Sequence, residues 1–231
     1  MTSASIENYL KAIYQLQENS ETVTTTALAQ YLAVAPASAT NMIKKLARLQ
    51  LVRHAPYHGV ELTRVGEKMA LEVLRHHRLI ELFLAQALGV PWEAVHAEAE
   101  KIEHVISEDL EDRIAAFLGD PRRDPHGDPI PTKAGVVERT PYQTLAQIGA
   151  GRSAVIQRVS DRNPEDLKHF AKLGLVLGAR VQILPHDASD GSLRVRVNAG
   201  RAHVLDETLT RSIWVRPLAV AKRAKAKKTK K

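Results

Sequence analysis

The chain contains no cysteine among its 231 residues. This absence excludes disulfide bonds, thiolate zinc sites and thiol catalysis, and it leaves His, Asp, Glu and Asn as the available metal ligands. Aromatic residues make up only 4% of the chain, so an extended stacking platform for single-stranded nucleic acid is not expected. No signal peptide or transmembrane span is predicted. We therefore expect a cytoplasmic protein with no membrane partner.

Positive charge is concentrated at the C-terminal end. The formal net charge is +7, and the segment 219–231 holds seven Lys or Arg residues and no acid. The remainder is near neutral, so the overall charge does not by itself identify a nucleic-acid-binding fold. We expect the Lys-rich tail, residues 219–231, to be disordered because it has almost nothing to bury.

The first 72 residues show the pattern of a winged helix-turn-helix domain. Apolar spacing predicts a helix over residues 6–18, then a Thr-capped helix containing Leu28 and Leu32. A break at Ala35-Pro36 precedes a third helix that starts near Ala37. Two short β-prone runs flank Tyr57-His58-Gly59, which indicates a hairpin.

Two further domains are expected, so the fold class is mainly α with a small β domain. Helical spacing predicts long helices over residues 64–88 and 92–118, packed as an antiparallel hairpin. The Pro-, Gly- and Asp-rich stretch that begins at Gly119 marks a boundary, and we assign residues 73–140 to a helical domain with this Pro-rich linker. Residues 141–218 alternate strand-like runs with one short helix, which predicts a small barrel.

The third helix has a basic outward face that suits DNA. Asn41 is able to make bidentate contact with adenine in a major groove, while Lys44, Lys45 and Arg48 suit phosphates. His58 lies at the expected wing tip. The predicted DNA-binding residues are Pro36, Ser38, Thr40, Asn41, Lys44, Lys45 and His58. The alternatives are a merely solvated helix face and a winged domain that binds protein.

Histidines and acids recur at helical spacing on the two predicted long helices, residues 64–88 and 92–118. His96, Glu100, Glu103 and His104 follow one helical face, and His77 and Glu81 share another. At about 1.5 Å rise per residue, His96 and His104 lie roughly 12 Å apart, too far to bind one ion. We therefore predict two metal sites.

One predicted site contains Glu100, Glu103 and His104, with Asn8 of the first helix as a further candidate. The other contains His77, Glu81 and His96. Oxygen and imidazole ligands without sulfur suit manganese(II) or iron(II). The alternatives are an exposed, mutually neutralising acid–histidine face and a metal-dependent enzyme without DNA function. The H-x-x-E-H hydrolase motif, the P-loop and the dinucleotide fingerprint are absent, so no enzyme is expected.

The chain resembles the diphtheria-toxin-repressor family of metal-activated bacterial transcription regulators over nearly its whole folded length. The motifs that carry the resemblance are ENYLKAIYQL, LAVAPASATNMIKKLARLQLV, LTRVGE, RHHRLIELFL, VHAEAEKIEHVISEDLEDRI, PHGDPIP and LGLVLGARVQIL. The resemblance implies a winged DNA-binding domain, a helical dimerisation and metal-binding domain and an SH3-like C-terminal domain of the FeoA type.

The resemblance also implies site residues and partners. Glu100, Glu103 and His104 match the family's principal site, with Asn8 at its first-helix position, and His77, Glu81 and His96 match the second. The C-terminal domain would add Asp161 or Asp166. The resemblance further implies two metal ions per subunit, a homodimer formed through residues 75–118 and a palindromic double-stranded operator. Glu100 stands where iron-type members carry sulfur, which favours Mn(II) over Fe(II), whereas Lys11 stands where shorter manganese regulators place an acid. The implied function is repression of metal-uptake genes, with an iron(II)-dependent repressor as the alternative.

Overall fold

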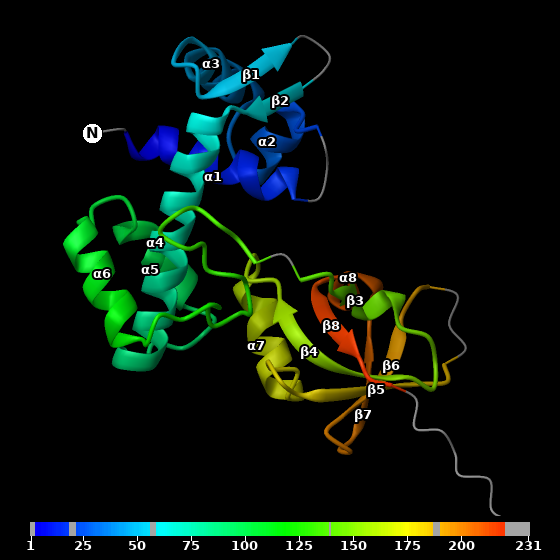
Figure 1. The fold of residues 1–231 in the computed structure, drawn as a ribbon. Helices are drawn as coiled ribbons and strands as arrows, with labels where there is room; N and C mark the ends of the chain where they lie inside the picture. The colour runs from blue at the N-terminus through cyan, green and yellow to red at the C-terminus, as the bar shows by residue number, and fades with distance from the viewer. Residues whose placement is uncertain (1–2, 19–21, 56–58, 139, 187–189, 220–231) are drawn as a thin grey trace, which may run out of the picture. The chain divides into compact units, whose positions relative to one another are not determined.

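A computed structural model describes the chain except residues 1–2, 19–21, 56–58, 139, 187–189 and 220–231. The chain divides into two compact units, residues 1–139 and 140–231, which are described separately (Figure 1). His58 and nearly all of the Lys-rich tail lie outside the described residues. The predicted boundary at residue 72 falls inside the first unit and stays a prediction.

The first unit begins with three helices and a two-stranded sheet. Their bounds are α1 Ala4–Gln17, α2 Thr25–Tyr31, α3 Pro36–Arg48, β1 Val52–Ala55 and β2 Gly59–Leu62. The Thr24 hydroxyl accepts a hydrogen bond from the Ala27 amide at 3.1 Å and starts α2. Proline at the first position of α3 fits there because no amide hydrogen is needed. The antiparallel pairing of β1 with β2 completes the predicted winged helix-turn-helix.

A common core holds these elements together. Leu10 and Ile13 of α1, Leu28 of α2, and Ile43 and Leu46 of α3 are all at most 1% exposed and belong to one apolar cluster. Each such side chain contributes about 1.5–3 kcal/mol on burial. Burying this side of α3 leaves its polar side facing outward.

Helix α4, Arg64–Leu88, has the bounds that the sequence predicts. The Thr63 hydroxyl accepts from the Gly66 amide at 3.1 Å at its start, and Gly89 ends it in the left-handed region at φ 66°. Gly66 packs so closely against Leu51, the residue before β1, that a Cβ on Gly66 would lie 2.0 Å from the Leu51 carbonyl oxygen.

In the described part of the chain, no helix is long and apolar enough to cross a membrane.

The prediction of one helix over residues 92–118 is wrong. The structure has α5, Val95–Ile102, and α6, Glu108–Phe117, separated by a short turn. The Ser107 hydroxyl accepts from the Leu110 amide at 3.3 Å and starts a new helix. Apolar spacing continues through this turn, but Val105 is 78% exposed, so the spacing does not mark one buried face. Glu103 and His104 therefore follow the end of α5.

The Pro-rich stretch after α6, predicted as the linker at the end of the helical domain, has buried residues of its own. It packs inside the first unit, where Asp124, His126, Asp128 and Ile130 are all buried. The Arg78 guanidinium of α4 donates to the Pro129 carbonyl at 2.6 Å and to Asp128 at 3.2 Å. These contacts tie the stretch to α4.

The second unit is a small antiparallel β domain. Its sheet has the strand order β3-β8-β4-β5-β6-β7. The elements are β3 Gln143–Thr144, η1 Leu145–Gln147, β4 Ser153–Val159, α7 Pro164–Leu173, β5 Arg180–Leu184, β6 Leu193–Val197, β7 Ala202–Leu205, α8 Glu207–Arg211 and β8 Ile213–Pro217. Alternate residues of β4 and β5 are buried, as the period-2 pattern predicts.

Candidate metal centre

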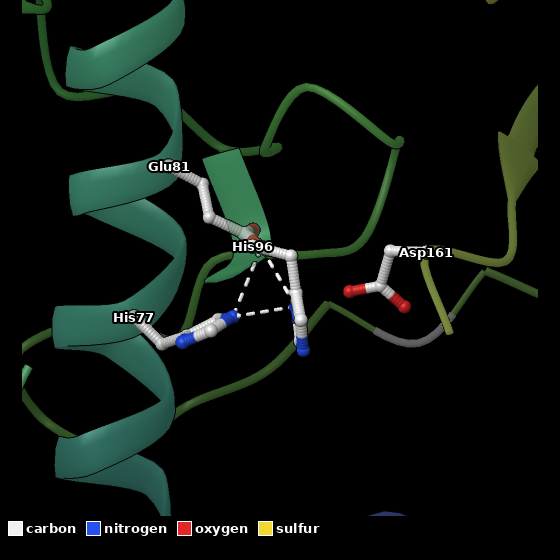
Figure 2. A group of neighbouring side chains, drawn as sticks. All are labelled: His77, Glu81, His96 and Asp161. Carbon is white, nitrogen blue, oxygen red and sulfur yellow. Dashed lines mark hydrogen bonds and ion pairs between the residues drawn. The ribbon is translucent and has the colours of Figure 1, made fainter. Parts of the chain in front are cut away.

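Three predicted ligands from α4 and α5 converge on one point (Figure 2). His77 and Glu81 lie one turn apart on α4, and His96 lies in the first turn of α5. The His77 Nε2 atom is 2.9 Å from Glu81 Oε1 and 3.1 Å from His96 Nδ1. The third side of this triangle, His96 Nδ1 to Glu81 Oε1, is 3.1 Å. We call these three residues the His77 centre.

The spacing of these atoms fits a divalent cation. Ligand atoms bonded at about 2.1 Å in octahedral geometry lie about 3.0 Å from one another. Two imidazole nitrogens and a carboxylate oxygen form a donor set that Mn(II), Fe(II) and Zn(II) accept. Glu81 is fully buried and His77 is 3% exposed, so an uncompensated carboxylate here would be costly. The residues present therefore fit a metal ion.

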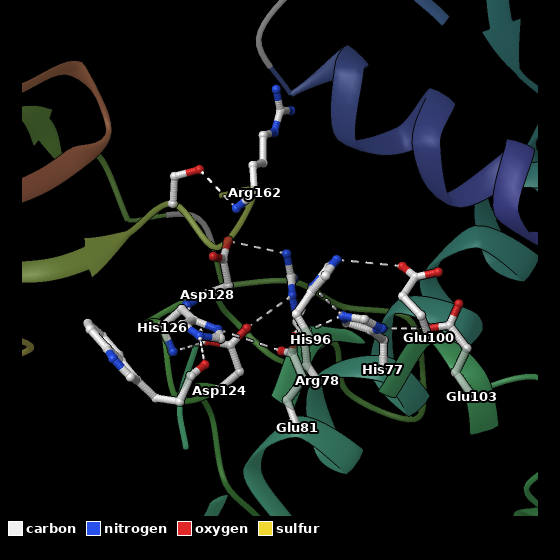
Figure 3. Close-up of polar contacts among 12 residues, drawn as sticks. His77, Arg78, Glu81, His96, Glu100, Glu103, Asp124, His126, Asp128 and Arg162 are labelled. Atoms are coloured by element: carbon white, nitrogen blue, oxygen red, sulfur yellow. Dashed lines mark hydrogen bonds and ion pairs between the residues drawn. The ribbon is translucent and has the colours of Figure 1, made fainter. Parts of the chain in front are cut away.

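The His77 ring is held on its other side by Glu103, whose Oε2 contacts Nδ1 (Figure 3). Such a carboxylate fixes the ring so that Nε2 is directed at the centre. Burial lowers the pKa of the His77 imidazole, and the charge of Lys11 lowers it as well. The charge of Glu81 and the hydrogen bonds to Glu103 and Glu81 raise it, and the net pKa is raised. A metal ion bound at this imidazole competes with the proton whose binding the raised pKa favours.

This raised pKa predicts a pH dependence of metal affinity. A metal ligand must be neutral imidazole, so binding releases the His77 proton wherever pH is below its raised pKa. We expect the Mn(II) association constant to rise about tenfold per pH unit in that range. Isothermal titration at several pH values, in buffers of different ionisation enthalpy, measures this. A dependence that stops at the ordinary histidine pKa of about 6.5 would contradict the assignment.

A second cluster connects α1 to the turn after α5. His104 Nε2 lies 2.7 Å from the Asn8 amide oxygen and 3.2 Å from Glu103 Oε1. Its Nδ1 lies 2.6 Å from Glu7 Oε2. Sequence reasoning missed Glu7, although it neighbours Asn8 on the same helix. We call Glu7, Asn8, Glu103 and His104, with Glu100, the α1 cluster.

The ammonium of Lys11 holds the position of a cation in the α1 cluster. Lys11 Nζ is 2.7 Å from Glu100 Oε1 and 2.7 Å from Glu103 Oε1. Burial lowers the pKa of this ammonium, but the charges of Glu103 and Glu100 and their hydrogen bonds together raise it by more. The net pKa is therefore raised, and Lys11 is charged. The pKa of Glu103 is lowered despite its burial, through the His77 hydrogen bond and the Lys11 charge. A metal ion in this cluster has to displace Lys11.

The structure thus brings together seven of the eight predicted metal ligands as two adjoining groups. Glu103 joins them, because Oε1 faces Lys11 and Oε2 faces His77. The eighth, Asp161, belongs to the second unit, as does its alternative Asp166. Their role as ligands stays a prediction.

The DNA-facing prediction concerns the outer side of α3. Pro36, Ser38, Asn41, Lys44, Lys45 and Arg48 are exposed, and Thr40 is half-buried. The Thr40 hydroxyl donates to the Pro36 carbonyl at 2.9 Å. A shallow depression is lined by Asn41, Lys44, Ala47, Arg48 and His54. His54, on β1, is an added candidate that the sequence did not single out.

Family models match three consecutive parts of the chain. Residues 1–60 match the iron dependent repressor N-terminal DNA binding domain. Residues 63–132 match the iron dependent repressor metal binding and dimerisation domain. Residues 143–217 match the FeoA domain.

Characterised relatives match across most of the chain. The iron-dependent repressor IdeR of Mycobacterium leprae is 33% identical over 189 residues, which cover 77% of this chain and 82% of that protein. The diphtheria toxin repressor of Corynebacterium glutamicum is 28% identical over 211 residues, covering 87% and 91%.

Solved structures agree with these matches. A manganese-dependent transcriptional repressor in complex with manganese superposes with a TM-score of 0.87 at 38% identity, covering 92% of this chain and 100% of that one. The IdeR structure from T. acidophilum superposes with a TM-score of 0.77 at 30% identity, covering 93% and 99%.

Proposed function

This chain belongs to the iron-dependent and diphtheria-toxin repressor family, whose members are metal-dependent transcriptional repressors and not enzymes, and we propose that manganese(II) activates it to repress metal-uptake genes. Its DNA-binding and dimerisation domains imply operator DNA and a homodimer. The observation that carries the metal dependence is the triangle of His77, Glu81 and His96 donor atoms, each about 3 Å from the others. The proposal includes a cytoplasmic location, where the DNA target lies.

Two observations support manganese. The ligand candidates are oxygens and imidazole nitrogens, and the family resemblance implies that Glu100 stands where iron-type members tend to carry sulfur. In addition, a manganese-dependent repressor solved with manganese is 38% identical. Iron(II) is the second candidate, because residues 63–132 match the iron dependent repressor metal binding and dimerisation domain and the IdeR protein of Mycobacterium leprae is 33% identical.

The proposed switch acts through Glu103. His77, Glu81 and His96 would hold one ion, while Asn8, Glu100, Glu103 and His104 would hold a second once Lys11 has withdrawn. A bound divalent cation supplies the positive charge that holds these carboxylates and imidazoles together. Asn8 then ties α1 to the turn after α5, and α1 packs on α2 and α3 through Leu10 and Ile13. The orientation of α3 is thereby biased toward the DNA-binding state, to the extent that metal affinity differs between the two states.

The proposed DNA contact predicts a specific salt effect. Lys44 is exposed in the middle of α3, so Lys44→Ala should weaken operator binding and lower the slope of log affinity against log salt by about 0.9. Fluorescence anisotropy at several salt concentrations measures the slope. Lys172→Ala, an exposed lysine of α7, is the matched control. An unchanged slope in the Lys44 variant would remove this residue from the phosphate contacts.

The metal assignment is tested by titrating Mn(II), anaerobic Fe(II) and Zn(II) into the protein with labelled DNA from upstream of metal-transporter genes. Half-maximal, sequence-selective binding at lower free Mn(II) than free Fe(II) supports the proposal. The reverse order selects the iron(II) repressor. Binding that is the same on scrambled DNA contradicts operator recognition by this chain.

A further inference from the structure

The strands of the second unit carry arginine but no acidic residue. None of the strands β3 to β8 contains Asp or Glu, whereas β4, β5, β6 and β8 contain arginine. The described acids of this unit lie on its helices and in its loops instead. The strands of this sheet are therefore charged with one sign only.

Strand pairing places Arg180 and Arg216 on one face of the sheet. Arg180 of β5 and Arg216 of β8 both pair with Val155 of β4, from its two sides. Paired residues of antiparallel strands point to the same face, and the neighbouring pair, Ala154 and Val181, is buried on the other face. Both arginines are exposed, so their face is turned to solvent.

The arginines of β6 lie on this face as well. Arg196 pairs with Gln182, which lies two residues from Arg180 on β5, and side chains two apart on a strand share a face. Arg194 is exposed and Arg196 is half-buried, whereas Val195 between them is buried. We call Arg180, Arg194, Arg196 and Arg216 the arginine face.

The charges of the arginine face are not neutralised within the described part of the chain, where none of its four guanidiniums forms an ion pair. Exposed cations on the helices of the same unit are paired. Lys168 lies 2.7 Å from Glu165 on α7, and Arg211 lies 2.6 Å from Glu207 on α8. The arginine face is therefore available to an anionic partner.

The residue before the Lys-rich tail lies beside the arginine face. The Leu218 amide donates to the Ser153 carbonyl oxygen at 2.8 Å, and Ser153 pairs with Gln182, the partner of Arg196. The sequence after Leu218 adds seven Lys or Arg residues and no acid. So many positive charges favour a polyanion over a single small anion.

Duplex DNA is the polyanion that the rest of this chain indicates. Residues 1–60 match a DNA binding domain, and because both units belong to one chain, a duplex held by the first is at high effective concentration for the second. The guanidinium fork of arginine matches phosphate oxygens. At about 3.4 Å per residue, Arg194 and Arg196 are roughly 7 Å apart along β6, so each can contact a different phosphate.

We propose that the arginine face binds the phosphate backbone of double-stranded DNA outside the base pairs that α3 reads. This inference rests on the proposed function for the presence of the duplex, and it adds a DNA contact made by the C-terminal unit. Phosphate contacts carry no sequence information directly. The face therefore adds affinity to any duplex long enough to reach it, with or without metal.

The test uses the full chain and two duplexes in saturating Mn(II), an operator trimmed to its footprint and the same operator with about 15 unrelated base pairs at each end, roughly one and a half turns. The variant combines Arg180→Gln, Arg194→Gln and Arg216→Gln. We expect its affinity for the longer duplex to fall at least about tenfold and its salt slope to fall by up to about 2.7, or about 0.9 for each lost contact. Its affinity for the trimmed operator should be native.

The matched control combines Lys168→Gln, Lys172→Gln and Arg211→Gln, which removes the same charge from exposed positions of α7 and α8. It should keep the native slope, and thermal unfolding shows whether both variants are folded. Combined Arg→Lys changes at the three arginine positions keep the charge and should keep most of the slope. A native slope in the glutamine variant, an equal fall in the control or an equal loss on both duplexes would overturn the proposal.

A measurement on scrambled DNA of the longer length, in chelator, separates this proposal from the proposed function. Weaker binding by the glutamine variant than by the native chain supports the arginine face even where operator binding ignores metal. Metal-dependent operator binding with native affinity of the glutamine variant for every duplex overturns only the arginine face. Loss of binding to a poly-glutamate peptide, with DNA binding unchanged, would assign the face to an acidic protein and overturn the DNA contact.

Discussion

Glu103→Gln is expected to abolish most of the metal-dependent rise in DNA affinity, by at least about 100-fold. Glu103 is 1% exposed, and its two oxygens serve the two candidate metal groups. Oε1 lies 2.7 Å from Lys11 Nζ and 3.2 Å from His104 Nε2, while Oε2 contacts His77 Nδ1. Glutamine has the same shape, but it removes the charge and replaces one oxygen with a donor. Loss of such a supporting carboxylate alone costs about 10–100-fold in metal affinity, and Glu103 is also a candidate ligand itself.

The measurement is operator affinity by fluorescence anisotropy at fixed salt, with saturating Mn(II) and with chelator. Glu98→Gln is the control, because Glu98 is an exposed acid of α5, the helix that ends just before Glu103, and it pairs with the exposed Lys101. Thermal unfolding in chelator shows whether the variant is folded. If folded Glu103→Gln protein keeps the native ratio between the two affinities, Glu103 does not couple metal to DNA binding.

Lys11→Met is expected to tighten Mn(II) binding in the α1 cluster by at least about tenfold, or about 1.4 kcal/mol. In the native chain the ammonium lies 2.7 Å from both Glu100 Oε1 and Glu103 Oε1. A metal ion must therefore break two charged hydrogen bonds before it can use these oxygens. Methionine keeps the length and apolar stem of the side chain but leaves the carboxylates to the ion.

The same change should destabilise the metal-free protein. Removing one partner of a buried ion pair typically costs about 3–5 kcal/mol, and we expect less here because the Glu100 side chain is 36% exposed. Denaturant unfolding in chelator and Mn(II) titration by electron paramagnetic resonance give the two values. Lys101→Met, an exposed lysine of α5, is the control. Mn(II) affinity that is unchanged in Lys11→Met would show that the lysine does not compete with metal.

Where a helix has a recognisable capping residue at each end, its bounds could be predicted from the sequence. Helix α4 is bounded by a threonine cap at Thr63 and a left-handed glycine at Gly89, and both residue types act through the local backbone. The break between α5 and α6 was not predicted because apolar residues keep helical spacing across it. Only the Ser107 cap marks the break, and a single serine is a weak signal in a sequence.

The donor set of the His77 centre was predictable because i, i+4 spacing on a helix places His77 and Glu81 on one face. The position of Lys11 was not predictable, since it depends on how α1 packs against the turn after α5. The same holds for His126, whose segment has the composition of an exposed linker but packs against α4 through Arg78. Tertiary packing, rather than local pattern, decides these contacts.

We propose that a divalent metal ion held by this chain controls its binding to DNA. The most direct test measures the operator dissociation constant of the native chain at fixed salt, once in chelator and once in saturating Mn(II), and compares the two as a ratio. We expect a ratio of at least about 100, or about 2.7 kcal/mol, and its reversal by added chelator. We also expect His96→Ala, which removes one corner of the ligand triangle, to lower this ratio. A native ratio of one on a sequence that the protein binds selectively would contradict the account.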